Sequence, residues 1–380
     1  MKTVAIFGST GSIGKQSLEV IRAFPNDFKV IALTAHSSAK LLDAQSKEFG
    51  AKSALGLKNK EELIANADYV INGVPGFDGL GISIAALKAG KILLSANKES
   101  LAIAGKWLKE IAKENGAKIY PLDSEASAIW QLMHEHGEDI LSSVTLTCSG
   151  GPFLGKTTDE LANVTIQQAL DHPTWQMGPK VSLDSATLIN KVLEVCEVSK
   201  LFNIPFSKIH ISVHPQSLVH SMVHTKTGGT KMHITQNDMR LFISYALHYP
   251  NQPEPAWPIL RAKRSEMNFL QADEETFRSI KWLKQHGGNP NFPIVLNALN
   301  DIATSRFLNG DMKFLEIYDF IEAGFEKWLY EMPPKTLEEM IEFHEKITNE
   351  HSNTASRGKV LASQAKYNSG RHSRSRALDS

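Results

Sequence analysis

The stretch "TVAIFGSTGSIG", residues 3–14, joins an apolar run to three glycines spaced three residues apart, and a helical pattern begins near Lys15. Gly8, Gly11 and Gly14 let the backbone turn tightly, so that amides at the start of the helix face a pyrophosphate. Three glycines alone also fit an ordinary packing turn, but the strand before them and the helix after them favour a dinucleotide-binding loop. The stretch therefore predicts the first unit of a nucleotide-binding sheet.

The same order of apolar run, turn and amphipathic helix repeats through the first 150 residues. Strands that alternate with helices are typical of a parallel sheet with helices on both faces. The sequence therefore predicts an α/β fold that begins with a doubly wound, Rossmann-type domain. The candidate strands are residues 3–7, 29–35, 68–73, 91–96, 117–122 and 143–148.

A second domain is predicted after residue 122. Residues 184–202 carry the broad apolar face of a helix, and residues 208–225 and 230–235 alternate as strands do. These elements predict a mixed α+β domain. Within it, the irregular segment 171–180 contains Pro, Gly and Trp and is a candidate flap over a site.

Four prolines between Pro250 and Pro258 interrupt regular structure, and three amphipathic runs follow them. This pattern predicts a linker and then a small C-terminal helical bundle. The end of the chain is rich in Ser and Arg and poor in large apolar residues, which is typical of disorder. The predicted division is a nucleotide-binding domain at 1–122, a catalytic domain at 123–250, a linker at 251–284, a helical bundle at 285–350 and a disordered tail at 351–380.

The charge balance excludes several classes of partner. Forty-one basic and 41 acidic residues cancel, so no net field attracts nucleic acid or an anionic membrane surface. Only two cysteines, Cys148 and Cys196, are present, which argues against a disulfide framework and fits a reducing compartment. No apolar run approaches the length of a membrane span, and the first residues already form a candidate strand. We therefore expect a cytoplasmic protein with no nucleic-acid or membrane partner.

The residues after the second candidate strand bear on the choice of cofactor. NAD-binding domains usually place Asp or Glu there to bind the ribose hydroxyls, whereas this chain has His36, Ser37, Ser38 and Lys40. These polar or cationic groups suit a 2′-phosphate, so the sequence favours NADP over NAD. An ordinary strand-to-helix loop is the alternative for each of them.

Two carboxylates, Asp123 and Glu125, come directly after the fifth candidate strand, at the edge where open parallel sheets place ligands. Acids this close repel each other unless a cation or a proton neutralises them, and their oxygens suit Mg²⁺ or Mn²⁺. A solvated loop or a helix cap is the alternative. On the long helix of the second domain, Asn190, Lys191 and Glu194 share one surface, either in the same site or as an ordinary surface pair with its neighbours.

Eight short stretches, taken together, resemble the 1-deoxy-D-xylulose 5-phosphate reductoisomerase family. They occur in the family's order and extend over nearly all of the chain up to about residue 345. Each is short, but eight in register are very specific. They are "GSTGSIG" (8–14), "ANKESL" (96–101), "PLDSE" (121–125), "SGGPF" (149–153), "HPTWQMG" (172–178), "DSATLINK" (184–191), "HPQSLVHSM" (214–222) and "NALNDIA" (297–303).

The resemblance implies an NADPH- and metal-dependent enzyme of non-mevalonate isoprenoid biosynthesis that works as a homodimer. It would isomerise the sugar phosphate 1-deoxy-D-xylulose 5-phosphate and reduce the product to 2-C-methyl-D-erythritol 4-phosphate. The resemblance also implies a ligand set for the metal, Mg²⁺ or Mn²⁺, which consists of Asp123, Glu125 and Glu194.

Further roles follow from the same resemblance. The implied catalytic residues are Lys98, Glu125, His172 and His220. The implied substrate contacts are Lys98, Ser124, Glu125, Ser149, His172, Trp175, Ser185, Asn190, Lys191 and Glu194. The implied cofactor contacts are Gly8, Thr10, Gly11, Ser12, Ile13, Gly14, His36, Ser37, Asn97, Lys98, Glu99, Met177 and Gly178.

Three positions depart from the family pattern. Ala126 stands where a histidine is common, Val192 stands where a small residue is usual, and Ala35 and His36 stand where many relatives have Gly with a basic or amide residue nearby. The last departure concerns recognition of the 2′-phosphate most directly.

Two other functions are compatible with parts of the sequence. A semialdehyde-type NADP dehydrogenase needs a cysteine nucleophile, for which Cys148 is the candidate, although a buried, inert thiol is the commoner role of such a residue. A non-enzymatic NADP-sensing protein would keep Asp123 and Glu125 as structural groups only.

Overall fold

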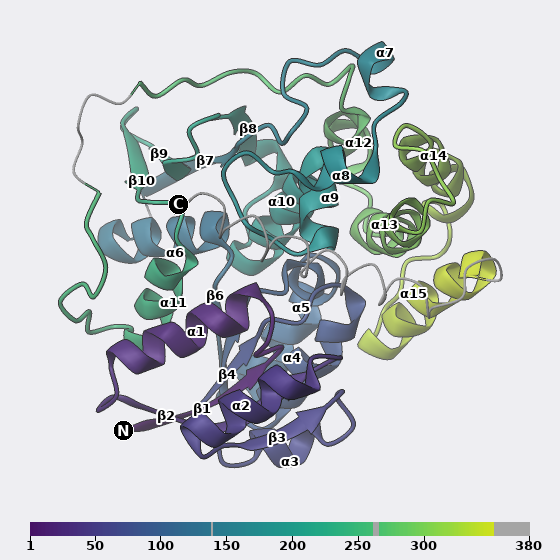
Figure 1. Cartoon of the computed structure of the whole chain (residues 1–380). Helices are drawn as coiled ribbons and strands as arrows, with labels where there is room; N and C mark the ends of the chain where they lie inside the picture. The colour runs from purple at the N-terminus through teal and green to yellow at the C-terminus, as the bar shows by residue number, and fades with distance from the viewer. Residues whose placement is uncertain (138–139, 261–265, 353–380) are drawn as a thin grey trace, which may run out of the picture.

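The computed structural model describes residues 1–137, 140–260 and 266–352, and its α/β fold confirms the predicted class (Figure 1). The first sheet has six strands in the order β3-β2-β1-β4-β5-β6, and every pair is parallel. The strand order reverses at β1 and β4, and the carboxyl ends of such strands form a crevice for ligands. The strands are β1 (Lys2–Phe7), β2 (Phe28–Ala35), β3 (Lys52–Leu55), β4 (Tyr69–Asn72), β5 (Ile92–Ser95) and β6 (Lys118–Pro121).

Helices cover both faces of this sheet because its central strands are apolar along their whole length. The helices α1 (Ser12–Ala23), α2 (Ala39–Phe49) and α11 (Met239–His248) share one apolar core with the sheet. A second core contains α3 (Lys60–Ile64), α4 (Leu80–Lys88) and α5 (Lys98–Glu114). The sheet is thus the middle layer of three, as a doubly wound fold requires.

The second sheet has four strands in the order β10-β9-β7-β8, with one parallel pair and two antiparallel pairs. Apolar side chains of α6 (Ser124–His136) and α10 (Ile189–Phe202) pack against it. The strands are β7 (Leu141–Cys148), β8 (Ile209–Val213), β9 (Val219–Thr225) and β10 (Thr230–Ile234). This arrangement agrees with the predicted α+β domain.

Three details differ from the sequence prediction. The predicted strand at 143–148 exists as β7, but it belongs to the second sheet, because an apolar run identifies a strand and not its partner. The short edge strand β3 was not predicted, since its four residues are mostly exposed. The helix predicted at 184–202 is two helices, α9 (Pro179–Ala186) and α10, separated where Leu188 has a φ of 56°.

The C-terminal helices are α12 (Arg278–His286), α13 (Phe292–Leu308), α14 (Glu316–Trp328) and α15 (Leu337–Ser352). Because α13 is buried along most of its length, it forms the centre of the predicted bundle. Helix α12 begins inside the range predicted for the linker. Residues 353–380 of the predicted tail lie outside the described residues, and residue 351 belongs to α15. None of the helices in the described part of the chain has the length and apolarity that a membrane span requires.

Candidate active site

The predicted nucleotide loop connects β1 to α1. Gly14 has no room for a side chain, because a Cβ there would lie 2.3 Å from the carbonyl oxygen of Gly8 and from Ser9 Cα. The amide of Gly11 donates to the same carbonyl at 3.0 Å, and α1 starts at Ser12. The glycines therefore form the compact turn that leads backbone amides into a helix N-terminus.

A residue that the sequence analysis did not single out holds this loop. Ser9 Oγ donates to Gln45 Oε1 at 2.8 Å, and Gln45 Nε2 donates back to the carbonyl of Ser9 at 3.0 Å. Both residues are buried. Gln45 lies on α2 among other polar residues, so the sequence offers no local signal for it.

The residues predicted to face a 2′-phosphate lie at the carboxyl end of β2. His36, Ser37 and Lys40 are all exposed there, beside the strand β1 that feeds the glycine loop. Their position is compatible with the predicted role in binding NADP.

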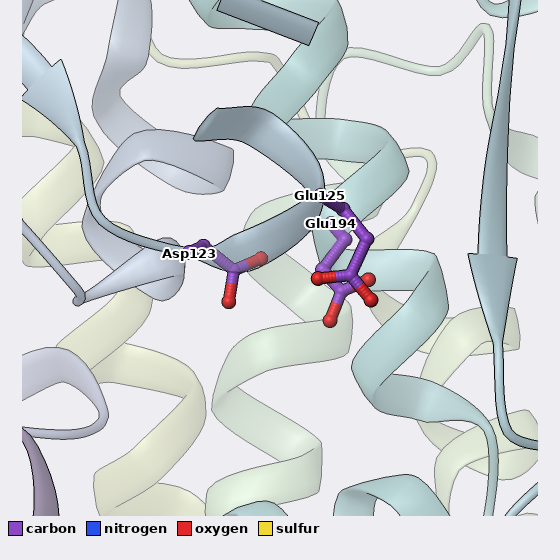
Figure 2. A group of neighbouring side chains, drawn as sticks. All are labelled: Asp123, Glu125 and Glu194. Carbon is purple, nitrogen blue, oxygen red and sulfur yellow. The ribbon is translucent and has the colours of Figure 1, made fainter. Parts of the chain in front are cut away.

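Three carboxylates meet at a second position, and we call Asp123, Glu125 and Glu194 the acidic triad (Figure 2). Asp123 precedes α6 and Glu125 lies in its first turn, whereas Glu194 comes from α10. One oxygen of each lies within 4.8 Å of the others. Asp123 makes no side-chain cap of α6, so the helix-cap alternative does not explain it.

Two lysines neutralise the acidic triad. Lys98 Nζ lies 2.9 Å from Asp123 Oδ1 and 2.7 Å from Glu194 Oε1. Lys191 Nζ lies 2.6 Å from Glu125 Oε1 and also pairs with Glu194. The exposed fraction of Lys191 is 2% and that of Glu194 is 1%, so the surface-pair alternative is wrong.

Asp123 and Glu125 have opposite pKa shifts. Burial raises the pKa of Asp123 to about 7, although Lys98 opposes the shift. Burial also acts on Glu125, but Lys191 and Lys98 outweigh it and lower the pKa to about 2. One turn beyond Glu194, burial raises the pKa of Glu197, and neither of its side-chain oxygens has a hydrogen-bond partner. Spacing alone did not separate Glu194 from Glu197, whereas the structure places only Glu194 in the triad.

The acidic triad fits a divalent cation. Its donors are carboxylate oxygens, which suit Mg²⁺ and Mn²⁺, and they converge from two helices on one point. Asp123 Oδ2 is buried and has no hydrogen-bond partner, so at least one ligand atom is free. Ser124 Oγ donates to Glu125 Oε2 at 2.6 Å and helps to orient that carboxylate.

The predicted flap is tied to the second domain through His172. The ring Nδ1 accepts hydrogen bonds from the amides of Thr174 and Trp175 at 3.2 and 3.0 Å. Nε2 therefore carries the proton and donates to Ser149 Oγ at 3.0 Å. Burial lowers the pKa of His172 to about 4, so the ring is neutral near pH 7.

Other predicted substrate residues contact the neighbouring segments or the acidic triad. A Cβ on Gly151 would lie 2.6 Å from the carbonyl of Ser185, so the turn after Ser149 packs tightly against α9. The rings of Trp175 and His220 are 6.1 Å apart, and Asn190 Nδ2 donates to Glu194.

The cofactor residues predicted outside the glycine loop differ in what they contact. The flap reaches the loop, because Ser12 Oγ donates to the carbonyl of Gln176, the residue before Met177, at 3.5 Å. Gly178 begins α9 as its N-cap. Asn97 caps α5 by accepting from the amide of Ser100. The side chain of Glu99 is turned instead toward Gly76, Asn97 and Lys180.

Cys148 lacks the surroundings of a nucleophile. Its Sγ lies 3.8 Å from the carbonyl of Ser212, and burial raises the pKa of the thiol to about 11. A thiol that stays protonated near neutral pH is a poor nucleophile.

Known protein families match most of the chain. The model described as 1-deoxy-D-xylulose 5-phosphate reductoisomerase matches residues 4–64 and 53–105, and its C-terminal domain matches residues 119–202. A DXP reductoisomerase C-terminal domain matches residues 234–350.

Curated relatives carry the same name. The chain is 40% identical over 347 residues to 1-deoxy-D-xylulose 5-phosphate reductoisomerase of Thermodesulfovibrio yellowstonii, which covers 85% of this chain and 91% of the relative. It is 42% identical over 327 residues to that of Leifsonia xyli subsp. xyli, with 85% and 90% covered. The chain belongs to the 1-deoxy-D-xylulose 5-phosphate reductoisomerase family. The predicted family is thereby confirmed.

Solved structures of reductoisomerases share the fold. A DOX-P reductoisomerase in complex with NADPH, fosmidomycin and magnesium has a TM-score of 0.86 at 30% identity, and 93% of this chain and 98% of that chain are covered. The enzyme from Zymomonas mobilis in complex with NADPH has a TM-score of 0.83 at 32% identity, with 92% and 98% covered. The protein is therefore an NADP-dependent oxidoreductase of this family, and the dehydrogenase and sensor alternatives are not favoured.

Proposed function

We propose that the acidic triad holds the divalent cation with which this enzyme converts 1-deoxy-D-xylulose 5-phosphate to 2-C-methyl-D-erythritol 4-phosphate. The reaction uses NADPH, and magnesium is the metal found with this family. The convergence of Asp123, Glu125 and Glu194 within 4.8 Å is the observation that carries the proposal. When bound, the cation polarises the carbonyl and hydroxyl oxygens of the ketose and so promotes the rearrangement of its carbon skeleton.

Lys98 and Lys191 have a second role in this proposal. Each now pairs with two carboxylates of the triad. With a cation held by the triad, these carboxylates would no longer need the lysines for charge balance, and the two ammonium groups would be available to the substrate. Lys98 then contacts the sugar together with Ser124, and Lys191 contacts the phosphate.

The phosphate end of the substrate is assigned to Ser149, Ser185 and Asn190 as well as Lys191. His172 positions Ser149, because its protonated Nε2 holds the hydroxyl at 3.0 Å. Trp175 and His220 close the site and exclude water, which strengthens every charge interaction inside it. Met177 and Gly178 of the flap hold the nicotinamide end of NADPH, and the glycine loop holds its pyrophosphate.

The test is a spectrophotometric assay of NADPH oxidation with purified protein and 1-deoxy-D-xylulose 5-phosphate. Oxidation should require the sugar phosphate, stop in EDTA and return with excess Mg²⁺. Oxidation that continues in EDTA would exclude a metal role for the triad. No oxidation under any condition would remove the proposal entirely.

A homodimer is part of the proposal. β10 is an edge strand of the second sheet, and the exposed fractions of its Met232 and Ile234 are 41% and 44%. Ile259 is also exposed, and the carbonyl of the preceding Pro258 accepts a hydrogen bond from Gln236, two residues beyond β10. Exposed apolar groups on an unpaired edge are typical of a surface that a partner covers. Sedimentation equilibrium should give twice the chain mass, and the double substitution Met232→Lys and Ile234→Lys should give one chain mass.

The predicted division at residues 122, 250, 284 and 350 remains our proposal for the domains. Limited proteolysis should first remove the tail after residue 350 and should then cut between 251 and 277. We also place the enzyme in the cytoplasm, because both of its cysteines are free thiols. Recovery of the protein in an extracellular or membrane fraction would contradict that location.

A further inference from the structure

A second, partly buried group of carboxylates lies around Lys180, the second residue of α9 and the last residue of the predicted flap. Lys180 Nζ lies 2.8 Å from Asp184 Oδ2, 3.1 Å from Asp301 Oδ1 and 3.8 Å from Glu99 Oε1. We call these four residues the Lys180 cluster. Its acids come from α9, from bundle helix α13 and from α5 of the nucleotide-binding domain.

Amide groups hold the second oxygen of each carboxylate. Asn300 Nδ2 donates to Asp184 Oδ1 at 2.8 Å, and Asn97 Nδ2 donates to Glu99 Oε2 at 3.0 Å. Asn297 Nδ2 approaches Asp301 Oδ2 at 3.4 Å. The cluster is therefore a single network, and Lys180 is its only cation among the described residues.

The network also reaches the loop that follows β4. The amide of Gly76 donates to Glu99 Oε1 at 3.0 Å, and the carbonyl of Gly76 accepts from Asn97 Nδ2 at 2.9 Å. A Cβ on Gly76 would lie 3.7 Å from both Lys180 Cε and Asp301 Oδ2. Since β4 borders the strand-order reversal, this loop lies at the edge of the cofactor crevice.

We propose that Lys180 is a positioning residue that fixes the C-terminal end of the flap against the cofactor domain and the helical bundle. The inference rests on the proposed function, because it assigns the nicotinamide end of NADPH to Met177 and Gly178. These residues precede Lys180 by three and two positions, so the ion pairs of Lys180 set where they lie. The ion pairs of Lys180 are with Glu99, Asp184 and Asp301, and not with the acidic triad.

Loss of the Lys180 ammonium should therefore weaken the binding and positioning of NADPH and leave the affinity for Mg²⁺ unchanged. Lys180→Met should raise the KM for NADPH roughly tenfold and lower kcat by a similar factor, because the nicotinamide is no longer held in a reactive position. The Mg²⁺ concentration for half-maximal activity should stay within about twofold of wild type. A matched control is Lys156→Met, which removes an exposed lysine paired with Glu160 at 2.6 Å and should leave all three quantities unchanged.

Two further variants keep the proposal testable if three uncompensated carboxylates prevent Lys180→Met from folding. Lys180→Arg keeps the charge and should restore most of the activity. Asp301→Asn keeps Lys180 and weakens only the bundle contact, so kcat/KM for NADPH should fall about threefold at an unchanged Mg²⁺ requirement.

The results that would contradict the positioning role of Lys180 differ from those that would contradict the proposed enzymatic function. Wild-type protein without metal-dependent NADPH oxidation contradicts the function, and NADPH binding followed by tryptophan fluorescence then still compares the variants. If Asp301→Asn matches Lys156→Met in NADPH affinity and kcat, and Lys180→Met also matches it where that variant folds, Lys180 has no positioning role. A parallel rise in the Mg²⁺ requirement would also overturn the proposal, because it indicates general loosening of the site.

Discussion

The acidic triad with its two lysines and the Lys180 cluster with its one lysine both hold three carboxylates in poorly exposed parts of the same molecule. In the Lys180 cluster one oxygen of each carboxylate lies within 3.8 Å of the lysine Nζ, and the other accepts a hydrogen bond from an asparagine amide. In the triad, Asp123 Oδ2 has no partner, and the ligand atoms converge within 4.8 Å. Each carboxylate oxygen of the Lys180 cluster thus has a lysine or an amide beside it, whereas Asp123 Oδ2 of the triad is free to bind a cation.

The difference shows that residue type and burial do not by themselves identify a metal site. A metal site needs carboxylate oxygens that have no other partner and that converge on one point. Amides satisfy the Lys180 cluster, because Asn97, Asn297 and Asn300 lie beside its acids. No comparable set of amides surrounds the triad in the described part of the chain, where lysines occupy the oxygens that a cation would take.

The largest effect should come from Glu125→Gln, which removes one anionic ligand from the triad at nearly constant shape. We expect kcat to fall by about a thousandfold or more, while the Kd for NADPH stays nearly unchanged. Stopped-flow or steady-state assays at saturating Mg²⁺ measure the first quantity, and fluorescence titration measures the second. Glu160→Gln, at an exposed pair, is the control. A normal kcat in Glu125→Gln would mean that the triad does not hold the catalytic metal.

Asp301 of the Lys180 cluster should contribute to a different quantity, the dependence of the unfolding free energy on pH. Burial raises the pKa of Asp301 to about 6 from 3.8, so the folded state binds a proton that the unfolded state has released. The unfolding free energy should therefore decrease as pH rises from about 4 to about 6, by at most about 3 kcal/mol from this group. Asp301→Asn should remove this contribution, so in urea titrations performed in EDTA the unfolding free energy of wild type should fall relative to that of the variant as pH rises from about 4 to about 6. If the unfolding free energies of wild type and variant depend on pH in the same way, Asp301 does not have the raised pKa.

Lys191→Ala tests whether Lys191 binds the phosphate of the substrate. Because we assign Lys191 to the substrate phosphate, the KM for 1-deoxy-D-xylulose 5-phosphate should rise roughly 30-fold, with a smaller change in the KM for NADPH. Steady-state kinetics at high Mg²⁺ provide the measurement, since the cation then compensates the carboxylates that lose their lysine. An unchanged KM for the sugar phosphate would limit Lys191 to a structural role.

The smallest effect concerns the cofactor phosphate at the carboxyl end of β2. Wild-type protein should prefer NADPH to NADH, and Lys40→Ala should reduce the ratio of their kcat/KM values only about three- to tenfold, because Lys40 is exposed and screened by solvent. His36 and Ser37 remain to contribute. Equal kcat/KM for NADH and NADPH in the wild type would contradict the inference from the missing acidic residue.

The contrast between the two clusters also separates what the sequence can predict from what it cannot. Asp123 and Glu125 are one residue apart after a strand, and the glycines stand at fixed spacing, so local patterns indicate both sites. Glu194 follows from its motif, because spacing alone admits Glu197 equally well. The partners of Lys180 come from helices that are distant in sequence, and no local pattern connects Glu99 with Asp301.

Errors in the predicted fold have related physical causes. Apolar residues continue at helical spacing from Leu183 to Leu193 and hide the left-handed backbone at Leu188, so one helix was predicted where two exist. β7 has the apolar character of a strand, but its neighbours β8 and β9 lie more than 60 residues further along the chain. Pairing at that distance depends on packing of the whole domain.

Anomalous diffraction from a crystal soaked in Mn²⁺, with the sugar phosphate and NADPH present, tests the proposed metal site most directly. We expect one strong peak within coordination distance of an oxygen from each of Asp123, Glu125 and Glu194, with Lys98 and Lys191 moved from those oxygens to the substrate. A strong peak at any other position, or a triad still occupied by its two lysines, would contradict the proposed metal site.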